Sequence, residues 1–236
     1  KVAINTTLKS LASQKRKLRR TVNLYMRHFL KVRLLRYILG FLFCSTLLCI
    51  SNLDIVNDLN YFDDALILHE EDNILISTKE DERGRLWCIS EVVLPFNKKK
   101  IISSLKNFEN YNNIFKRIST CKIVSDNVVH IRLDMPYFIS DRDYIVEYTM
   151  IEQKGKTIFA FDSGSHGSKP LLEKSVRLPN ASGAWVLEFK SESSTKVSYI
   201  WNGELLGDFP NWALENAWKT QGQEVFVWME DYLNKK

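Results

Sequence analysis

The chain has 236 residues, of which 45 % are hydrophobic and 26 % charged, and these ordinary values exclude a chain that is disordered throughout. Residues 1–51 carry eleven Lys/Arg and no Asp/Glu, whereas residues 52–236 carry 22 Lys/Arg and 28 Asp/Glu, a net charge of −6. Phosphate contacts need clustered Lys/Arg, and the acidic part has only the short run Lys98 to Lys100, so we expect no nucleic-acid partner.

Residues 1–51 form a basic leader, which we separate from a globular domain over residues 52–236. The fourteen residues 37–50 contain no charge and follow a series of cations. As a helix they would rise about 21 Å, less than the hydrocarbon core of about 30 Å, which is typical of a signal peptide. We therefore expect a protein that is exported or anchored in a membrane through residues 37–50, with a buried core helix as the alternative. Met26 is a candidate initiator, and cleavage is left open.

The first part of the globular domain predicts helices mixed with strands. Near-helical spacing of apolar residues favours a short helix within 58–73, and Asn97 is placed to cap a helix that continues to Phe108. A further short helix is expected at 111–118. Two strands are predicted before the capped helix, over 74–78 and 85–94, and Pro95 ends the second.

Six more strands and one long helix are predicted in the second part. The strands are expected over 128–136, 144–152, 156–163, 173–178, 184–189 and 196–205. Their short connections require antiparallel hairpins. Pro210 suits the first turn of a final helix over 209–233, whose apolar stripe is interrupted by Gln221 and Gly222.

These elements predict an α+β fold, in which a strongly curved antiparallel sheet holds the final helix against its concave face. One helix cannot fill the concave side of eight curved strands, so we expect a cavity between them. Gln221 and Gly222 would border that cavity, the glutamine offering a polar contact and the glycine a close approach to the backbone. The alternative is that both belong to a solvated turn of an imperfect helix.

Cysteine and histidine positions give little sign of metal or cofactor chemistry. Cys88 lies in a predicted strand and Cys121 follows a predicted helix, with no C-x-x-C motif and no nearby pair of histidines, so we expect no metal site and no cofactor. The two thiols are expected to be buried and inert, and a disulfide between them is the alternative.

Four stretches of sequence resemble START domains, the StAR-related lipid-transfer family. The string MPYFISDRDYIVEY supplies Pro136, Ser140, Arg142, Asp143 and Tyr144 at the positions of the family's P…S-x-R-D-aromatic signature. The stretches VVLPFNKKKIISSLKNFENYNNIF, SGAWVLEF and GDFPNWALENA agree in order and spacing. The resemblance covers roughly residues 60–233.

The resemblance implies the helix-grip fold, with a tunnel that holds one lipid or sterol-like molecule and is roofed by the C-terminal helix and a loop. It implies binding rather than catalysis. The loop 205–210 would then be a hinge, and Phe138, Ile139, Phe209 and Trp212 would touch a membrane during ligand exchange. We expect a monomer that contacts membranes transiently.

Nine residues are candidates for contact with this ligand. Arg142 would recognise a polar head group or instead brace a turn. Arg132 and Asp134 share one face of a strand and would form a head-group site if that face is inward, but Val129, Ile131, Leu133 and Met135 form a competing apolar row that favours the outward alternative. The remaining candidates belong to the cavity wall or to the core: Trp185, Tyr199, Trp201, Trp218, Gln221 and Val225.

We find no catalytic residues. None of the four histidines lies in a hydrolase, metalloprotease or phosphate-loop motif. A polyketide cyclase or aromatase-like enzyme on the same fold is the alternative function, and its turnover would depend on Arg132, Asp134 or His166. A protein-interaction module, with a solid interior and an exposed apolar patch, is the third.

Overall fold

The computed structural model describes residues 51–58, 60–136, 138–164, 166, 174–202 and 204–235. These residues lie in one compact unit, Ser51–Lys236. The predictions for the leader, including the apolar segment 37–50, concern residues outside this part of the chain.

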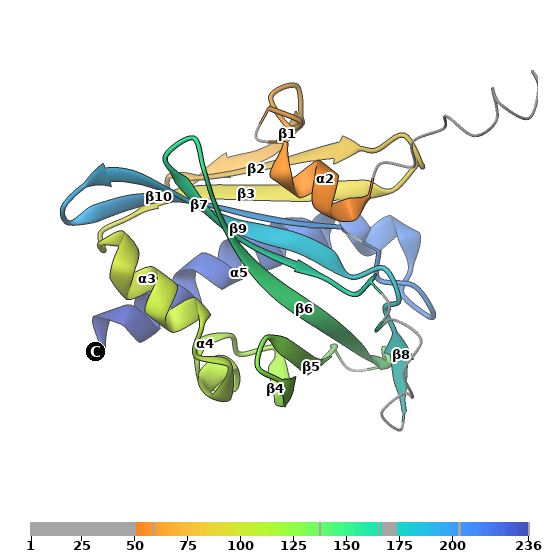
Figure 1. Ribbon diagram of the computed structural model, residues 1–236. Coiled ribbons are helices and arrows are strands. Elements are labelled where there is room, and N and C mark those ends of the chain that lie inside the picture. The colour runs from red at the N-terminus through yellow and green to blue at the C-terminus, as the bar shows by residue number, and fades with distance from the viewer. Residues whose placement is uncertain are drawn as a thin grey trace, which may run out of the picture. The chain divides into compact units, whose positions relative to one another are not determined.

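A curved sheet of ten strands forms the body of the unit (Figure 1). Its strand order is β1-β2-β3-β10-β9-β7-β6-β5-β4, and each strand in this order is antiparallel to its neighbours. The strand β8 runs parallel to the start of β6. The strands are β1 (Leu66–Glu71), β2 (Ile74–Glu80), β3 (Leu86–Leu94), β4 (Ile118–Ser125), β5 (Val128–Leu133), β6 (Asp141–Gln153), β7 (Lys156–Asp162), β8 (Ser175–Arg177), β9 (Ser182–Ser191) and β10 (Ser194–Asn202).

Two of these strands were not predicted. The expected helix within 58–73 is wrong, because β1 pairs with β2 there and the helix α2 lies earlier, at Asn52–Asn57. Asp72 and Asn73 both have positive φ, 52° and 63°, which is the geometry of a two-residue hairpin turn. The short helix expected at 111–118 ends at Ile114 as α4 (Tyr111–Ile114), since Ile118 already belongs to β4.

The other two helices lie where they were predicted but are shorter at one end, since α3 (Lys98–Leu105) ends before Phe108, and α5 (Leu214–Asn234) begins at Leu214 and not at residue 209. The helix α3 begins as expected after Asn97, whose side chain accepts the backbone N–H of Lys100 at 2.9 Å, and the 3-10 turn η1 (Phe108–Asn110) follows it. The last helix, α5, starts after the 3-10 turn η3 (Asn211–Ala213). No helix among the described residues is long and apolar enough to cross a membrane.

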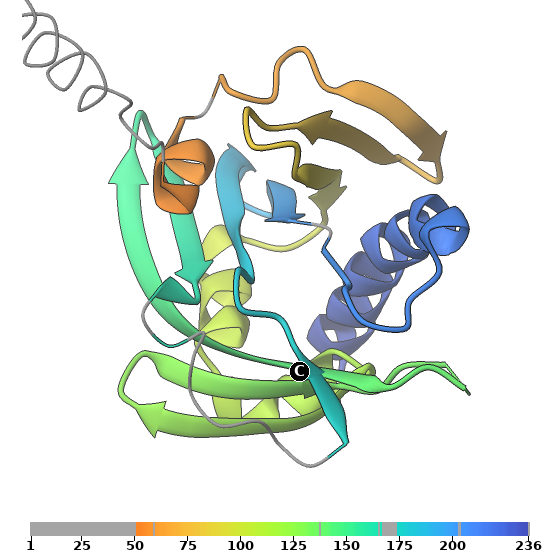
Figure 2. The ribbon, with the colours of Figure 1, turned by 90° about the vertical axis from the view of Figure 1, so that its right-hand side faces the viewer.

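The sheet wraps around α5, which lies across its open side (Figure 2). The main core fills the concave side between the strands, α5, α3 and α4, and a smaller core lies under α2 on the outer side. This arrangement confirms the predicted fold, a curved antiparallel sheet around a long C-terminal helix. A ligand-binding site is therefore expected where α5 faces the strands.

Candidate functional site

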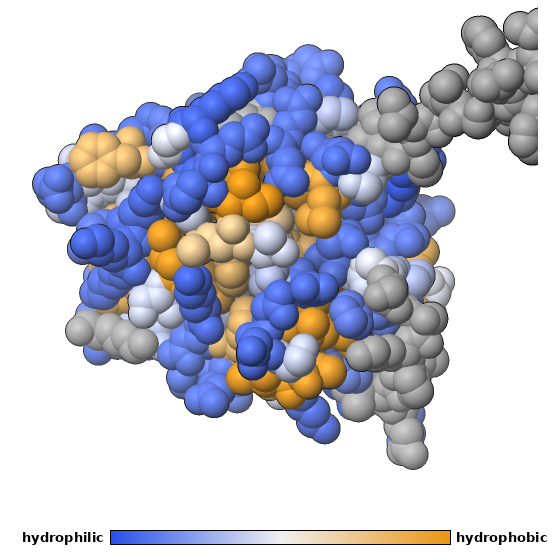
Figure 3. Space-filling model, in the orientation of Figure 1, coloured by the Kyte–Doolittle hydropathy of each residue, from blue (hydrophilic) through white to orange (hydrophobic). Residues whose placement is uncertain are grey.

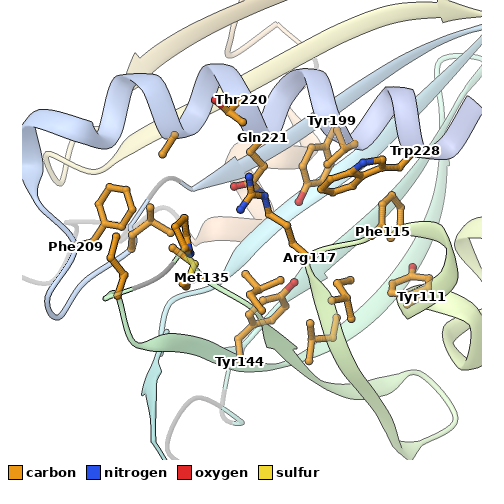
Figure 4. A pocket seen from close by; sticks show the side chains of 18 of the residues that line it. Tyr111, Phe115, Arg117, Met135, Tyr144, Tyr199, Phe209, Thr220, Gln221 and Trp228 are labelled. Atoms are coloured by element: carbon orange, nitrogen blue, oxygen red, sulfur yellow. The ribbon is translucent and has the colours of Figure 1, made fainter.

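A cavity of about 310 Å³ lies between α5 and the concave face of the sheet (Figure 4). Pockets that hold small molecules are usually about 300–1,000 Å³, so this one is at the small end of that range. Its wall combines side chains from α5, the central strands, the end of α4 and two loops: Tyr111, Phe115, Arg117, Ile131, Leu133, Met135, Ile139, Tyr144, Tyr148, Trp185, Tyr199, Leu205, Phe209, Asn216, Ala217, Thr220, Gln221, Val225 and Trp228.

Stacked aromatic rings give the cavity its firm apolar wall. Trp185 of β9 and Tyr199 of β10 are partners in the sheet register, and their ring centroids lie 4.3 Å apart. Trp201 stacks on the other side of Tyr199 at 4.7 Å, and Phe115 stacks against Trp185 at 5.7 Å. Rings that are held by their neighbours keep a cavity open, because they cannot collapse into it without losing these contacts.

A few polar groups interrupt the apolar wall. Arg117, just before β4, donates from Nε and Nη2 to the two carboxylate oxygens of Glu224 on α5, at 2.6 and 3.0 Å. Tyr199 of β10 and Gln221 of α5 face the cavity as well. Tyr144 of β6 also faces the cavity. The wall therefore offers an ion pair, an amide and phenols at separate places on an otherwise oily surface.

Burial keeps the cavity phenols protonated at neutral pH. It raises the pKa of Tyr111, Tyr144, Tyr148 and Tyr199 above the ordinary value, because the phenolate form would lose its hydration. A phenol in that state donates a hydrogen bond but does not act as a general base. Such a hydroxyl can orient a ligand oxygen where it is not already bound within the protein, as the Tyr111 hydroxyl is to the Leu105 carbonyl.

Four of the nine predicted ligand contacts come together in the cavity wall. Trp185, Tyr199, Gln221 and Val225 all line it. Trp201 and Trp218 are buried in the surrounding core and do not belong to the cavity wall. Both therefore correspond to the alternative in which these side chains are part of the core. Contact of any of these side chains with a ligand stays a prediction.

Gly222 does not border the cavity, and that prediction is wrong. Its carbonyl accepts a hydrogen bond from the Ser90 hydroxyl of β3 at 2.8 Å. A Cβ at this position would lie 3.2 Å from Ser90 and 3.0 Å from Ile76. The glycine thus allows a close approach to the helix backbone, as expected, but the group that approaches is the sheet.

Arg142 braces the loop that leads into α5. Its side chain is fully buried, and its guanidinium donates to the carbonyls of Leu205 at 2.8 Å and Leu206 at 2.6 Å, and to that of Ser140. It also forms an ion pair with Asp208 at 3.0 Å. This geometry corresponds to the alternative in which Arg142 braces a turn. Its donors are occupied within the protein, and contact of Arg142 with a ligand stays a prediction.

The side chains of Arg132 and Asp134 lie on the outer face of the sheet. Arg132 binds Asp141 through two nitrogens, at 3.0 and 2.7 Å, and Asp134 is exposed. Ile131 and Leu133, which alternate with them, line the cavity instead. The outward alternative is therefore confirmed for this strand.

Charged groups on the outside of the sheet hold β8 in place. Buried Asp143 accepts hydrogen bonds from Arg177 at 2.6 Å and Ser175 at 3.1 Å and contacts His130 at 2.6 Å. Burial opposes ionisation of Asp143, but Arg177 and His130 outweigh it and lower the carboxyl pKa.

His166 lies 3.8 Å from Glu147, away from the cavity wall. No three side chains in the described ranges form a metal-binding group.

Both cysteines of the described unit are free thiols, so the disulfide alternative is wrong. Cys88 lies on β3 and Cys121 on β4, which are separated by five other strands in the sheet order. Burial raises the pKa of Cys121 to about 12 and that of Cys88 further, because a thiolate would be poorly hydrated there. Inert thiols are the expected state.

A second hollow, of about 340 Å³, lies beside α2 on the outer face. Its apolar floor includes Ile89 and Val186, and hydrophobic side chains are visible over the middle of this face (Figure 3). Its polar groups are already paired, since Glu91 contacts Lys196 at 2.9 Å and Ser198 at 2.6 Å. The cavity under α5 is the better candidate, because it is more apolar and is closed by a helix and two loops.

Two groups in the cavity wall were missed by sequence reasoning. Arg117 lay near the end of the helix predicted at 111–118, where it had the pattern of an ordinary surface cation. Its partner Glu224 is 107 residues away. Tyr144 was noted only as part of the START-like signature. The register of β5 with β6, which pairs Tyr144 with the inward-facing Ile131, could have placed it inside.

Comparisons with known proteins agree with this architecture. No protein-family model and no curated protein sequence matches the chain. Among solved structures, the STAR-related lipid transfer protein of Xanthomonas axonopodis aligns with a TM-score of 0.63 and 16 % identity, covering 72 % of this chain and 98 % of that one. Human STARD10 aligns with a TM-score of 0.64 and 13 % identity, covering 76 % of this chain and 81 % of that one.

Human StAR-related lipid transfer protein 5 is similar to the same degree, with a TM-score of 0.63 and 12 % identity over 72 % of this chain and 86 % of its own. Identities this low establish architecture rather than activity. Two of the three proteins are named for lipid transfer. The chain therefore has the helix-grip fold of START domains.

Proposed function

We propose that this protein binds one lipid or sterol-like hydrophobic molecule in the cavity under α5, without catalysing a reaction, and transfers it between membranes. The observation that carries the proposal is the cavity of about 310 Å³ itself, walled by stacked aromatic and aliphatic side chains and roofed by one helix. An apolar space of this kind is stabilised by an apolar guest, because water inside it would find few hydrogen-bond partners.

Affinity would come mainly from burial of the guest's apolar surface. Each 100 Å² removed from water contributes about 2.5 kcal/mol, of which a part offsets the freedom that the guest loses on binding. The firm aromatic wall reduces the remaining cost, since Trp185, Tyr199 and Phe115 are already ordered by their mutual contacts.

The cyclase-like alternative would need titratable groups that face the guest. Arg132, Asp134 and His166, on which turnover was expected to depend, are absent from the cavity wall. The groups that do face the cavity are protonated phenols and an arginine paired with Glu224. This arrangement supports binding over catalysis.

The exposed apolar side chains next to the cavity support transient membrane contact. Phe138 is 92 % exposed and Trp212 is 83 % exposed. They belong to the two loops that also provide the cavity residues Ile139 and Phe209, and these loops are joined where Ser140 donates to Asp208 at 2.9 Å. A membrane touched by these tips would lie next to the guest, so we propose this edge as the route of exchange.

The leader adds a separate proposal from the sequence alone. Because residues 37–50 are uncharged and follow a cluster of cations, we propose that they direct export or anchor the domain to a membrane. The mass of the N-terminus of the protein isolated from its own cells tests this, since a start after residue 50 or retention in the membrane fraction supports it. A full-length, freely extractable chain would contradict it.

A cavity-filling substitution tests the proposed binding function. Ala217 of α5 lines the cavity, and Ala217→Phe would place a ring in the space that the guest needs. Val227→Phe is the matched control, because Val227 is on the same helix, 50 % exposed and outside the cavity wall. Titration with the fluorescent hydrophobic probe N-phenyl-1-naphthylamine should show saturable binding to the wild type and to the control, and at least tenfold weaker binding to Ala217→Phe. Equal binding by all three proteins would overturn the proposal.

A further inference from the structure

The Tyr144 hydroxyl faces the cavity and makes no hydrogen bond within the described part of the chain. Tyr144 lies near the start of β6 and its side chain points into the cavity toward Arg117 (Figure 4). The Tyr111 hydroxyl of the same wall differs, since it donates to the Leu105 carbonyl at 2.5 Å.

The hydroxyl faces the cavity space, and a guest that displaces water from it must supply an oxygen if the hydrogen bond is not to be lost. The phenol is held in the protonated form by burial, so it offers a donor as well as two acceptor lone pairs. Its position therefore marks where the polar end of a guest would lie.

The Arg117 guanidinium, which faces the same space, is electrically neutralised. Two of its nitrogens bind both carboxylate oxygens of Glu224, and the third, Nη1, has no partner in the described part of the chain. The pair as a whole has no net charge. It offers the cavity N–H donors without offering an uncompensated positive charge.

This charge balance separates three classes of guest. A carboxylate or phosphate would bring a negative charge beside a cation that Glu224 already neutralises. Because the side chains of this pair are 36 % and 29 % exposed, the remaining attraction is screened and would not offset the hydration that the anion loses. An ammonium would meet the same difficulty with the opposite sign. A hydroxyl or carbonyl oxygen adds no charge, and both Arg117 and Tyr144, which line the cavity, offer it a hydrogen-bond donor.

We infer that the cavity selects a compact, neutral hydrophobic molecule with an oxygen at one end, and that this oxygen binds between the Tyr144 hydroxyl and the Arg117 guanidinium. The inference rests on the proposed binding function and adds the chemical class of the guest. The volume of about 310 Å³ fits a single chain or a compact ring system better than a lipid with two long chains.

Displacement of N-phenyl-1-naphthylamine by 1-decanol and by decanoate at pH 8 tests this class, because the two probes share a chain and differ in the charge of the head. The wild type should bind 1-decanol about tenfold more tightly than decanoate. Tyr144→Phe, which removes only the hydroxyl, should weaken 1-decanol binding about fivefold to tenfold. Glu224→Gln should shift the preference toward decanoate by at least about tenfold, because Arg117 then lacks its counter-charge.

Tyr61→Phe is the control, since it deletes a hydroxyl from a tyrosine of the outer core that lies outside the cavity wall. It should leave both affinities and their ratio unchanged. Decanoate binding as tight as that of 1-decanol, or unchanged 1-decanol binding in Tyr144→Phe, would overturn the inference while leaving the binding function intact. Failure of the fluorescent probe and of both alkyl probes to bind the wild type would overturn the binding function itself.

Discussion

Arg142→Leu is expected to destabilise the protein strongly and to loosen the entrance of the cavity. The change removes a fully buried guanidinium that serves the carbonyls of Ser140, Leu205 and Leu206. Each buried acceptor that loses its donor costs about 1–3 kcal/mol, although water reaches Leu206, which is 43 % exposed. The ion pair adds little, because Asp208 is 42 % exposed.

The sum of these effects is about 3 kcal/mol. In a domain of this size 1 kcal/mol corresponds to about 2–4 °C, so the melting temperature should fall by about 6–12 °C, as measured by circular dichroism. Because Leu205 and Phe209 of the braced loop line the cavity, release of N-phenyl-1-naphthylamine in stopped-flow experiments should also become faster.

Arg132→Leu is the control for this prediction. It removes an arginine of the outer face whose pair with Asp141 is partly exposed, and the loss should be below about 1 kcal/mol. If Arg142→Leu lowers the melting temperature no more than Arg132→Leu does, the loop is not held by the buried guanidinium and the reasoning is refuted.

Three further predictions concern pH, membranes and thiols. The backbone N–H and the hydroxyl of Ser140, with Arg142, lower the pKa of Asp208 to about 2. The stabilisation by this carboxylate is present above about pH 4 and is lost as the pH falls toward 2. Asp208→Asn should therefore flatten the decline of the melting temperature in acid, and an unchanged decline would contradict the prediction. Phe138→Ser with Trp212→Ser should reduce sedimentation with phosphatidylcholine vesicles while the melting temperature stays within about 2 °C, and undiminished sedimentation would exclude these tips as the contact. Cys88 and Cys121 should resist iodoacetamide at pH 8 until the protein is unfolded, as peptide mass mapping would show, and rapid labelling of native Cys88 would be inconsistent with its burial.

Much of the architecture could be predicted, because the signals were local. Asn97 and Pro210 mark helix starts, and alternation marks most strands, so the sheet and its closing helix followed from the sequence. The strand β1 was missed because its short apolar spacing fits either structure. Pairing with β2 across the turn Asp72–Asn73 decides between them, and that turn was the overlooked signal.

The site was harder to predict, because inward and outward directions depend on tertiary packing. The interruption of the α5 stripe correctly indicated a change of surroundings, yet Gln221 faces the cavity and its neighbour Gly222 faces β3. Successive side chains on a helix point about 100° apart, so the pattern alone could not show which of Gln221 and Gly222 faces the cavity. The pair of Arg117 with Glu224 forms only when α5 crosses the start of β4, and no local pattern encodes it.

The central claim is that the space under α5 holds one hydrophobic guest. Native mass spectrometry of the purified wild type, before and after incubation with 1-decanol, tests it most directly. We predict one small molecule per chain, bound to the wild type and to Val227→Phe and absent from Ala217→Phe. A wild type that carries no guest and takes up no 1-decanol at saturation would contradict the claim.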